Sequence, residues 1–370
     1  HVLECFYSLM LFMPKKEIFT RARFYIFFLF LLALFIKFST TYLYANNYKI
    51  QNLEISAPYE VDFDKKKIID KAFFLAFKEL IAKITITDHS LNLYKTDLNI
   101  IKSLIDSFTI VDEKFIDNKY IAKFYVNFNK RQVLDFLEKE NIFPSIPREK
   151  SLFIMPVLID VQKNQLFLFS ENPFYLNWNN NNEKYYLLKY IVPNEDIEDI
   201  NLLRKNINNI EDYNFNEIIS KYDLNDYIII ILFKNNKNLK VLSKLNFDNN
   251  QIINNNFFSG INLEENKSLE KVINELKTNY ENEWKKINQI NTSIKLTLTL
   301  SLNSKNIKLI EKFEKEISNL DLISQYYIDY FSSENTIYKI IYNSTPKKFI
   351  QEIEKTGIKL DTSSQIWIVK

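Results

Sequence analysis

Hydrophobic and polar residues follow recognisable periods after residue 45, and these periods divide the chain into three segments. Alternation with a period of two predicts strands that bury one face, whereas apolar spacings of three and four predict helices. We therefore predict an α+β domain at 46–150, an α/β domain at 151–290 and a ferredoxin-like βαββαβ domain at 291–370. The expected fold class is a combination of α+β and α/β domains.

The first segment predicts a strand at 48–55, two helices, a hairpin and a closing helix at 131–140. The apolar stripes of the two helices are Ile69, Ala72, Phe73, Ala76, Phe77 and Leu80, followed by Leu98, Ile101, Leu104, Ile105 and Phe108. Asp64 is placed to cap the first of them. The hairpin turns at 117–119, and its second strand alternates strictly from Tyr120 to Phe128. Pro144 and Pro147 then indicate a linker.

The second segment mixes strands and helices around one strongly apolar run, Tyr227–Phe233. Such an uninterrupted run is typical of a strand in a sheet that is covered on both faces. Further strands are predicted at 152–160, 165–169 and 184–192 and near Val241 and Ile252, and helices at 196–207, 216–221 and 269–287. The order of these elements indicates an α/β layer.

The third segment has the clearest pattern, because its first strand alternates without interruption. The strand places Ile294, Leu296, Leu298, Leu300 and Leu302 on one face, and the next helix places Ile307, Ile310, Phe313 and Ile317 toward the core. Strands at 322–331 and 336–342 follow. A second helix begins after Thr345-Pro346 and ends at Gly357, and the last strand is QIWIV.

Composition excludes several classes of site. The chain of 370 residues has two glycines, one cysteine and two histidines. Glycine-rich phosphate loops and dinucleotide fingerprints need more glycine, and a zinc site needs more histidine or cysteine. We therefore expect no cofactor and no metal site. Asparagine is abundant, and we expect it to replace glycine in turns, because it tolerates left-handed backbone.

The N-terminal 45 residues predict an export signal. Met13 is a better start than His1, and from it a basic stretch precedes 13 apolar residues, Phe24–Ile36, and a polar region that ends at Ala45. The alternative is an uncleaved anchor spanning 24–45, although Lys37 disfavours it. Both alternatives place the rest of the chain outside the cytosol, so we expect a periplasmic protein, either free or anchored in the inner membrane by this segment alone.

Three stretches resemble a family of exported Gram-negative bacterial proteins whose domain has no known function. They are SFTIVDEKFIDNKYIAKFYVNFNKRQVLDFLEKENI, ENPFYLNW and YIVPNEDIEDI. The resemblance covers roughly 48–233, and the chain differs from the family in its low glycine content. The resemblance implies a periplasmic protein and no particular activity.

Carboxylates are the only catalytic groups present in number, since His89 is the one histidine after the leader and is expected on a surface loop. Glu195, Asp196, Glu198 and Asp199 lie together at a predicted helix start. Such acids can bind a hard cation or transfer protons. They also stabilise the positive end of a helix, and we favour this role, with Asp196 or Asn194 as the cap. Asp196 and Asp199 remain candidate binding residues.

Phe174 and Trp178 are the other candidate binding residues, because a spacing of four places both on one face of a helical turn. An exposed aromatic pair can hold a sugar or a peptide. A buried pair that anchors a loop is the favoured alternative.

We predict a non-enzymatic interaction or scaffold protein of the cell envelope, whose partner is another envelope protein. The alternative is a carboxylate-dependent hydrolase acting on envelope glycans or peptides. Nucleic acid is not expected as a partner, because the net charge is only +2 and the predicted ferredoxin-like strands lack the glycine-containing aromatic motif of RNA-binding sheets.

Overall fold

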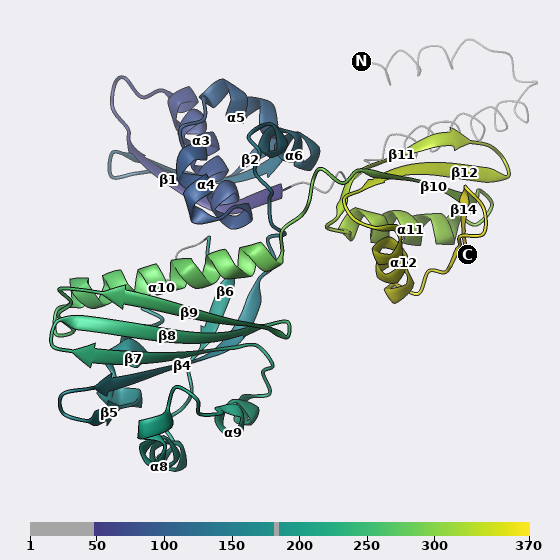
Figure 1. Cartoon of the computed structure of the whole chain (residues 1–370). Coiled ribbons are helices and arrows are strands. Elements are labelled where there is room, and N and C mark those ends of the chain that lie inside the picture. Colours follow the sequence, from purple (N-terminus) through teal and green to yellow (C-terminus); the bar gives the residue numbers. More distant parts are fainter. Residues whose placement is uncertain (1–47, 181–184) are drawn as a thin grey trace, which may run out of the picture. The chain divides into compact units, whose positions relative to one another are not determined.

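The computed structural model describes residues 48–180 and 185–370 (Figure 1). Their fold is mixed α+β with three separate sheets, and residues 46–370 form one compact unit. The predicted leader, residues 1–45, lies outside the described residues. None of the helices in the described ranges is both long enough and apolar enough to cross a bilayer.

The first sheet is antiparallel, with the order β1-β3-β2. Its elements are β1 (Tyr48–Pro58), α3 (Lys65–Ile84), α4 (Thr87–Leu93), α5 (Leu98–Leu104), β2 (Ile105–Ile116), β3 (Lys119–Phe128) and α6 (Lys130–Lys139). The alternation predicted for β3 is confirmed, since every second side chain from Tyr120 to Phe128 is buried. The helices pack on that face and form one apolar core with it.

Several local predictions in this segment are confirmed. The Asp64 carboxylate caps α3 by accepting a hydrogen bond from the Lys66 amide at 2.8 Å. The hairpin turns at Asp117 and Asn118, which have φ angles of 50° and 54°. Positive φ at both central residues is typical of the tight turn that matches strand twist.

Two predictions here are wrong. Ile105 and Phe108 belong to β2 rather than to the helix α5, because Ile105 is extended and pairs with Phe128 in the sheet ladder. His89 lies in the helix α4, half-buried, and not on a loop. Long-range pairing and packing outweighed local pattern in each case.

The second sheet has the order β5-β4-β7-β8-β9, and β6 also pairs with β4. Its strands are β4 (Lys150–Asp160), β5 (Gln165–Phe167), β6 (Leu188–Ile191), β7 (Tyr227–Asn235), β8 (Asn238–Phe247) and β9 (Asn250–Phe258). Its helices are α7 (Pro173–Asn177), α8 (Ile197–Lys205), α9 (Asn216–Ile219) and α10 (Asn266–Ile287), with short 3₁₀ turns η2 (Phe169–Glu171), η3 (Ile207–Asn209) and η4 (Ser220–Tyr222). β5 and β6 are shorter than predicted.

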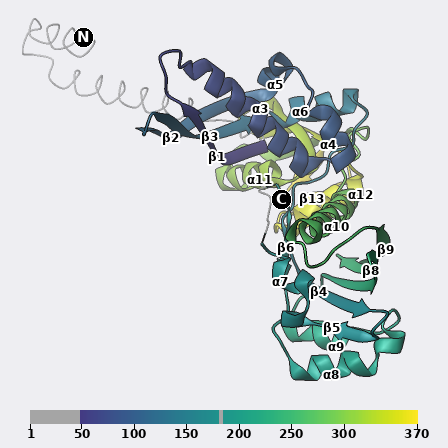
Figure 2. The ribbon, with the colours of Figure 1, turned by 90° about the vertical axis from the view of Figure 1, so that its left-hand side faces the viewer.

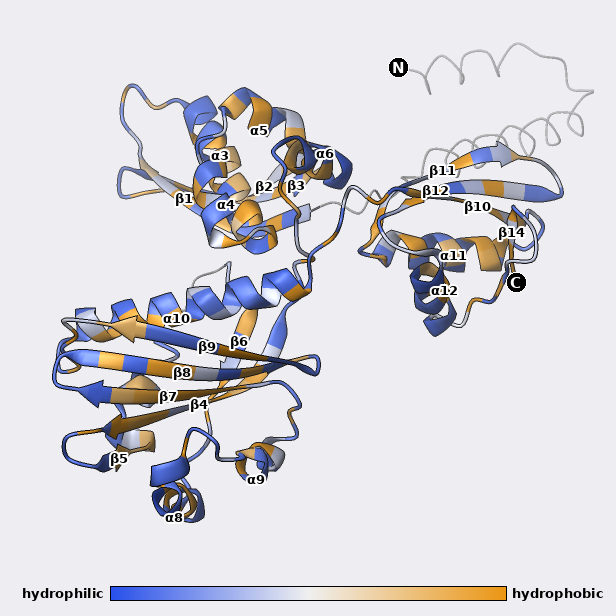
Figure 3. Ribbon diagram, viewed as in Figure 1, coloured by the Kyte–Doolittle hydropathy of each residue, from blue (hydrophilic) through white to orange (hydrophobic). Residues whose placement is uncertain are grey.

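Both faces of this sheet are covered, as the apolar run in β7 predicted. Ile228 and Ile230 face a core with α7 and α10, whereas Ile229 and Ile231 face a second core with α8 and α9. Figures 1 and 2 show α10 on one side of the sheet and α8 and α9 on the other. Figure 3 shows β4 and β7 hydrophobic along most of their length.

The third sheet has the order β11-β12-β10-β14-β13. Its elements are β10 (Leu296–Asn303), α11 (Ile307–Asn319), β11 (Ile323–Phe331), β12 (Asn335–Tyr342), α12 (Pro346–Lys355), β13 (Leu360–Asp361) and β14 (Trp367–Val369). β10 runs antiparallel to β12 and parallel to β14. The cap at Thr345 and the end of α12 before Gly357, which has a φ of +75°, are confirmed.

Two residues predicted in the third core lie outside it. Ile294 precedes β10 and is 42% exposed, and Ile307 is the first residue of α11 and is 64% exposed. Each stands at the end of its element, beyond the reach of the buried face. Phe313 and Ile317 are fully buried, as predicted.

Asparagine replaces glycine in turns, as its abundance predicted. The asparagines with positive φ in the described residues are Asn52, Asn118, Asn141, Asn164, Asn236 and Asn249. An amide side chain tolerates the left-handed region better than other side chains do. The two glycines, Gly260 and Gly357, also have positive φ.

Candidate functional site

The predicted acidic cluster forms an ion-pair network at the start of α8. The Asp196 carboxylate caps the helix by accepting a hydrogen bond from the Glu198 amide at 2.8 Å. Lys221 donates from Nζ to Asp196 and to Asp199, each at 2.7 Å. These bonds lower the pKa of Asp196 and raise the pKa of Lys221. The favoured structural role of Asp196 is confirmed by this geometry.

Asp199 differs from Asp196 because it is 1% exposed. Its Oδ1 accepts the Lys221 hydrogen bond, and its Oδ2 is buried without a hydrogen-bond partner among the residues that the structure describes. A buried carboxylate beside one ammonium group holds an ion pair rather than an open coordination site. In the ranges that the structure describes, no three histidine, cysteine, aspartate or glutamate residues are placed to hold a metal ion together.

Phe174 and Trp178 are fully buried and belong to the core between the sheet and α10. The Asn172 side chain starts their helix: its Oδ1 accepts from the Phe174 amide at 3.0 Å, and its Nδ2 donates to the Pro156 carbonyl oxygen at 3.0 Å. The favoured interpretation, a buried aromatic pair, is therefore confirmed, and the hypothesis of an exposed pair that holds a ligand is wrong. Four-residue spacing also fits burial, because this short helix docks on a hydrophobic sheet.

The two predicted groups do not form one site. Phe174 and Trp178 pack on the α10 face of the sheet, whereas α8, which carries Asp199, packs through Leu203 on the opposite face. A hollow of about 190 Å³ lies near the acidic cluster, and its polar side chains include Glu195 and Arg204 but neither Asp196 nor Asp199. The sheet itself therefore separates the acids from the aromatic pair.

A buried polar cluster on α10 adjoins Trp178. Lys277 is fully buried, with its Nζ 5.9 Å from the Trp178 ring and 5.7 Å from the Tyr190 ring. Burial lowers the pKa of Lys277 to about 8. One turn later, Glu281 accepts the amides of Leu187 and Leu188 through Oε1, and burial raises its pKa. Glu281 thus fixes the chain at the start of β6.

Sequence reasoning found Trp178 in this cluster but missed its charged members. The available signal was their position in α10, because Lys277 directly follows the buried Leu276 and Glu281 directly follows the buried Tyr280. A charged residue beside the apolar stripe usually faces solvent, so pattern alone does not distinguish the two outcomes. Three buried polar atoms here have no hydrogen-bond partner in the described residues: Trp178 Nε1, Tyr190 OH and Glu281 Oε2.

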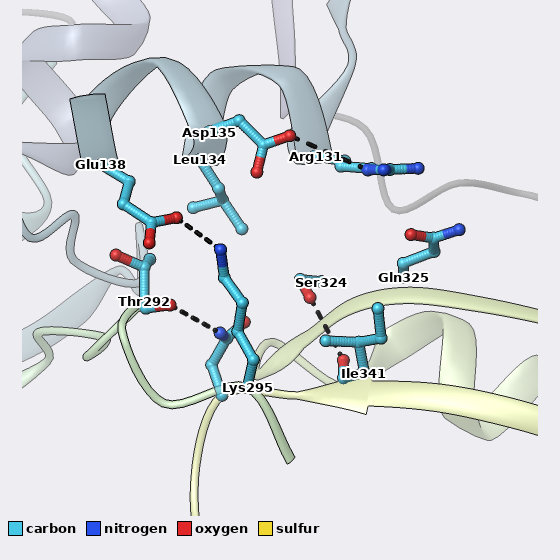
Figure 4. A pocket seen from close by; sticks show the side chains of 10 residues that line it. Arg131, Leu134, Asp135, Glu138, Thr292, Lys295, Ser324, Gln325 and Ile341 are labelled. Carbon is cyan, nitrogen blue, oxygen red and sulfur yellow. Dashed lines mark hydrogen bonds and ion pairs between the residues drawn. The ribbon is translucent and has the colours of Figure 1, made fainter. Parts of the chain in front are cut away.

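A cavity of about 150 Å³ lies between α6 and the strands β11 and β12 (Figure 4). Figure 4 shows Glu138 of α6 pointing toward Lys295, and the two side chains form an ion pair of 2.7 Å. Arg131 lies 3.8 Å from Asp135 on the same helix. Each charge that lines the cavity is therefore matched by an opposite one, and the cavity has no surplus charge that would select an ionic ligand.

A cluster of apolar side chains is exposed at the end of the first sheet where β2 turns into β3. We call it the tip cluster and define it as Tyr59, Val61, Phe115 and Ile116. Their exposed fractions are 48%, 110%, 55% and 51%. The Tyr59 and Phe115 rings lie 4.9 Å apart, and the Tyr59 amide donates to the Asn118 carbonyl oxygen at the hairpin turn. These contacts join the loop after β1 to the hairpin.

Comparison with known proteins gives no assignment. The chain matches no model of a known protein family, and no curated protein is similar to it.

Proposed function

We propose that this chain is a non-enzymatic exported protein that acts by binding another protein of the cell envelope. The tip cluster is the observation that carries this proposal. Exposed apolar side chains that gather on neighbouring segments of the chain are costly in water and are typical of protein-binding surfaces. Aromatic side chains such as Tyr59 and Phe115 are enriched in such interfaces.

The surroundings of the tip cluster suggest the chemistry of the partner surface. Glu60 and Asp62 flank Val61 and are exposed. Lys119, which pairs with Ile116 across the hairpin, is exposed too, so the charges around the tip cluster are of both signs and its apolar centre favours a partner with an apolar pocket. Val61 is the most exposed apolar side chain of the described residues, so it is the natural residue to enter such a pocket.

Asp196, Asp199 and Glu281 give the alternative, a carboxylate-dependent hydrolase, no support. The carboxylates of Asp196 and Asp199 are engaged by Lys221, and Glu281 is engaged by main-chain amides. A general acid or base needs access to substrate. Binding without catalysis is therefore the function that these groups favour.

The proposal includes the domain arrangement and the compartment predicted above. Domains at 46–150, 151–290 and 291–370 agree with three sheets that have separate apolar cores, and the leader at 1–45 stays a prediction from the sequence. The order β10-α11-β11-β12-α12 and the neighbours β11-β12-β10 agree with a ferredoxin-like unit, but β14 runs parallel to β10, whereas the fourth strand of a ferredoxin-like sheet runs antiparallel to the first. The compartment rests on the leader and on the resemblance to exported proteins.

Site-specific photocrosslinking in living cells tests the proposal. A photoreactive amino acid at Val61 should give one discrete adduct with an envelope protein. The matched control is Val161, which is 51% exposed and lies directly after β4. The adduct at Val61 should disappear when Phe115→Asp is added. Absence of an adduct at Val61, or the same adduct from Val161, would show that the tip cluster is not a binding surface.

A further inference from the structure

The outer edge of β9 differs from every other sheet edge in the described residues. The long edge strands β1, β2 and β11 each contain a shift of register, and the other edge strands, β5, β6 and β13, have four residues or fewer. β9 has nine residues, pairs with β8 without any shift and contains no charged residue, proline or glycine. Bulges and charges are the usual means of preventing edge-to-edge pairing, and β9 has neither.

The sequence of β9 is symmetrical about its centre. From Ile252 to Phe258 it reads two apolar residues, three asparagines and two apolar residues. Figure 3 shows this strand hydrophobic toward both ends and hydrophilic between them. Antiparallel pairing of the strand with itself about Asn255 would place each apolar residue opposite an apolar residue and each asparagine opposite an asparagine. Self-complementarity of this kind is what a two-fold interface requires.

The two faces of β9 have different surroundings. Ile253 and Phe257 point away from α10 and are 66% and 68% exposed. A groove of about 320 Å³ runs along the edge of β9 and is lined by residues 253–256. Its opposite wall is formed by α10, with the charged pair Glu283 and Lys286 beside Asn279 and Asn282. Asn256 Oδ1 is buried and has no hydrogen-bond partner among the described residues. The strand therefore has two apolar side chains exposed to solvent and one buried amide oxygen without a hydrogen-bond partner among the described residues.

We propose that β9 pairs antiparallel with β9 of a second copy of this chain, about a two-fold axis through Asn255. In this register Ile253 lies opposite Phe257 of the second copy, and Asn256 lies opposite Asn254 of the second copy. Directly opposite side chains in antiparallel strands are about 4.5–5.5 Å apart at Cβ, so the apolar pairs come into contact and the amides are placed to bond. The two six-stranded sheets become one continuous sheet. A second copy is the favoured occupant because it supplies the matching pattern without any charge opposite the neutral strand.

Sedimentation equilibrium tests the assembly. The purified chain should be a dimer at micromolar concentration. Asn255→Lys places two like charges opposite each other at the axis and should weaken dimerisation at least tenfold. Gln251→Lys is the matched control, because it adds the same charge on the same exposed face but away from the axis, and it should leave the dimer intact. A monomeric wild-type chain, or equal loss in both variants, would overturn the proposal.

Thiol crosslinking tests the register, with Cys5 replaced by serine. Cysteine at position 255 should react with its own copy through a short bis-maleimide. Cysteine at position 251 should not crosslink to position 251 of the second copy. In the proposed register position 251 lies opposite position 259, so the two cysteines are eight residues apart along the strand, roughly 26 Å at about 3.3 Å a residue. Mixing Ile253→Cys chains with Phe257→Cys chains should give the crosslinked heterodimer. Efficient crosslinking at 251 would indicate another register or open-ended strand association, and either would contradict the two-fold arrangement.

Discussion

Lys285 donates a hydrogen bond from Nζ to the main-chain carbonyl oxygen of Ala82 at 2.5 Å, across 203 positions of sequence. Ala82 lies in the last turn of α3, where carbonyl oxygens have no partner within the helix. Three residues before Lys285, Asn282 Oδ1 accepts the amide and the hydroxyl of Thr87 at 3.0 Å each. α10 therefore holds the junction of α3 and α4 by three hydrogen bonds that involve two of its side chains.

Replacing Lys285 with methionine should destabilise the chain by about 1–3 kcal/mol. Methionine keeps the length of the side chain but leaves the Ala82 carbonyl oxygen buried without a donor, and an unmade buried hydrogen bond costs that much. The measurement is the free energy of unfolding from urea titration. Lys286→Met is the matched control, because Lys286 is exposed and forms a surface ion pair with Glu283, and its effect should stay within about 0.5 kcal/mol.

Lys130 should make stability depend on pH in the alkaline range. Its Nζ donates to the Asp321 carbonyl oxygen at 2.6 Å, and burial lowers its pKa to about 8 from the ordinary 10.5. Between these values the unfolded chain holds a proton that the folded chain has released, so stability rises with pH.

Between pH 8 and pH 10.5 we expect the wild-type chain to gain roughly 1–3 kcal/mol relative to Lys130→Met, at 1.36 kcal/mol for each pKa unit. The measurement compares urea unfolding of the two proteins at pH 8, 9 and 10. Parallel pH profiles would show that Lys130 keeps an ordinary pKa in the folded chain.

Asp199 and Asp196 should respond differently to conversion into asparagine. Asp199→Asn removes the buried partner of Lys221 and should cost about 1–3 kcal/mol. Asp196→Asn should cost less than about 1 kcal/mol, since asparagine caps a helix as well as aspartate does and the ion pair lost is partly exposed. Thermal unfolding midpoints give the comparison. If Asp199→Asn kept the midpoint and abolished an envelope hydrolase activity, the acids would be catalytic and the structural role wrong.

Glu281 should tolerate glutamine far better than alanine. Glutamine retains an oxygen that can accept the Leu187 and Leu188 amides, whereas alanine leaves both without an acceptor. We expect Glu281→Ala to cost at least about 2 kcal/mol more than Glu281→Gln. Urea unfolding measures the difference, and hydrogen exchange at the two amides locates it. Equal exchange rates in the two variants would show that Glu281 does not hold β6.

Much of the local structure was predictable because it depends on neighbouring residues. Asp64, Asp196 and Thr345 cap the helices that follow them, since a cap needs only its own side chain and the next amides. The end of α5 and start of β2 at Ile105 were not predictable from neighbouring residues, because they depend on the pairing of Ile105 with the distant Phe128 in the sheet. The burial of Trp178 was left open in the same way, since four-residue spacing fits a binding face and a packed face equally well.

The sequence by itself determined the alternation of β3 and β10, the covered central strand β7, and the use of asparagine in turns. Each follows from the period of side chains along one element or from the backbone preference of one residue. Only the tertiary structure decided that Phe174 and Trp178 lie across the sheet from Asp199, that Lys277 and Glu281 are buried, and that β9 is an edge. These are relationships between elements far apart in the chain. The free energy of packing them depends on contacts between those elements, which the pattern within a single element does not predict.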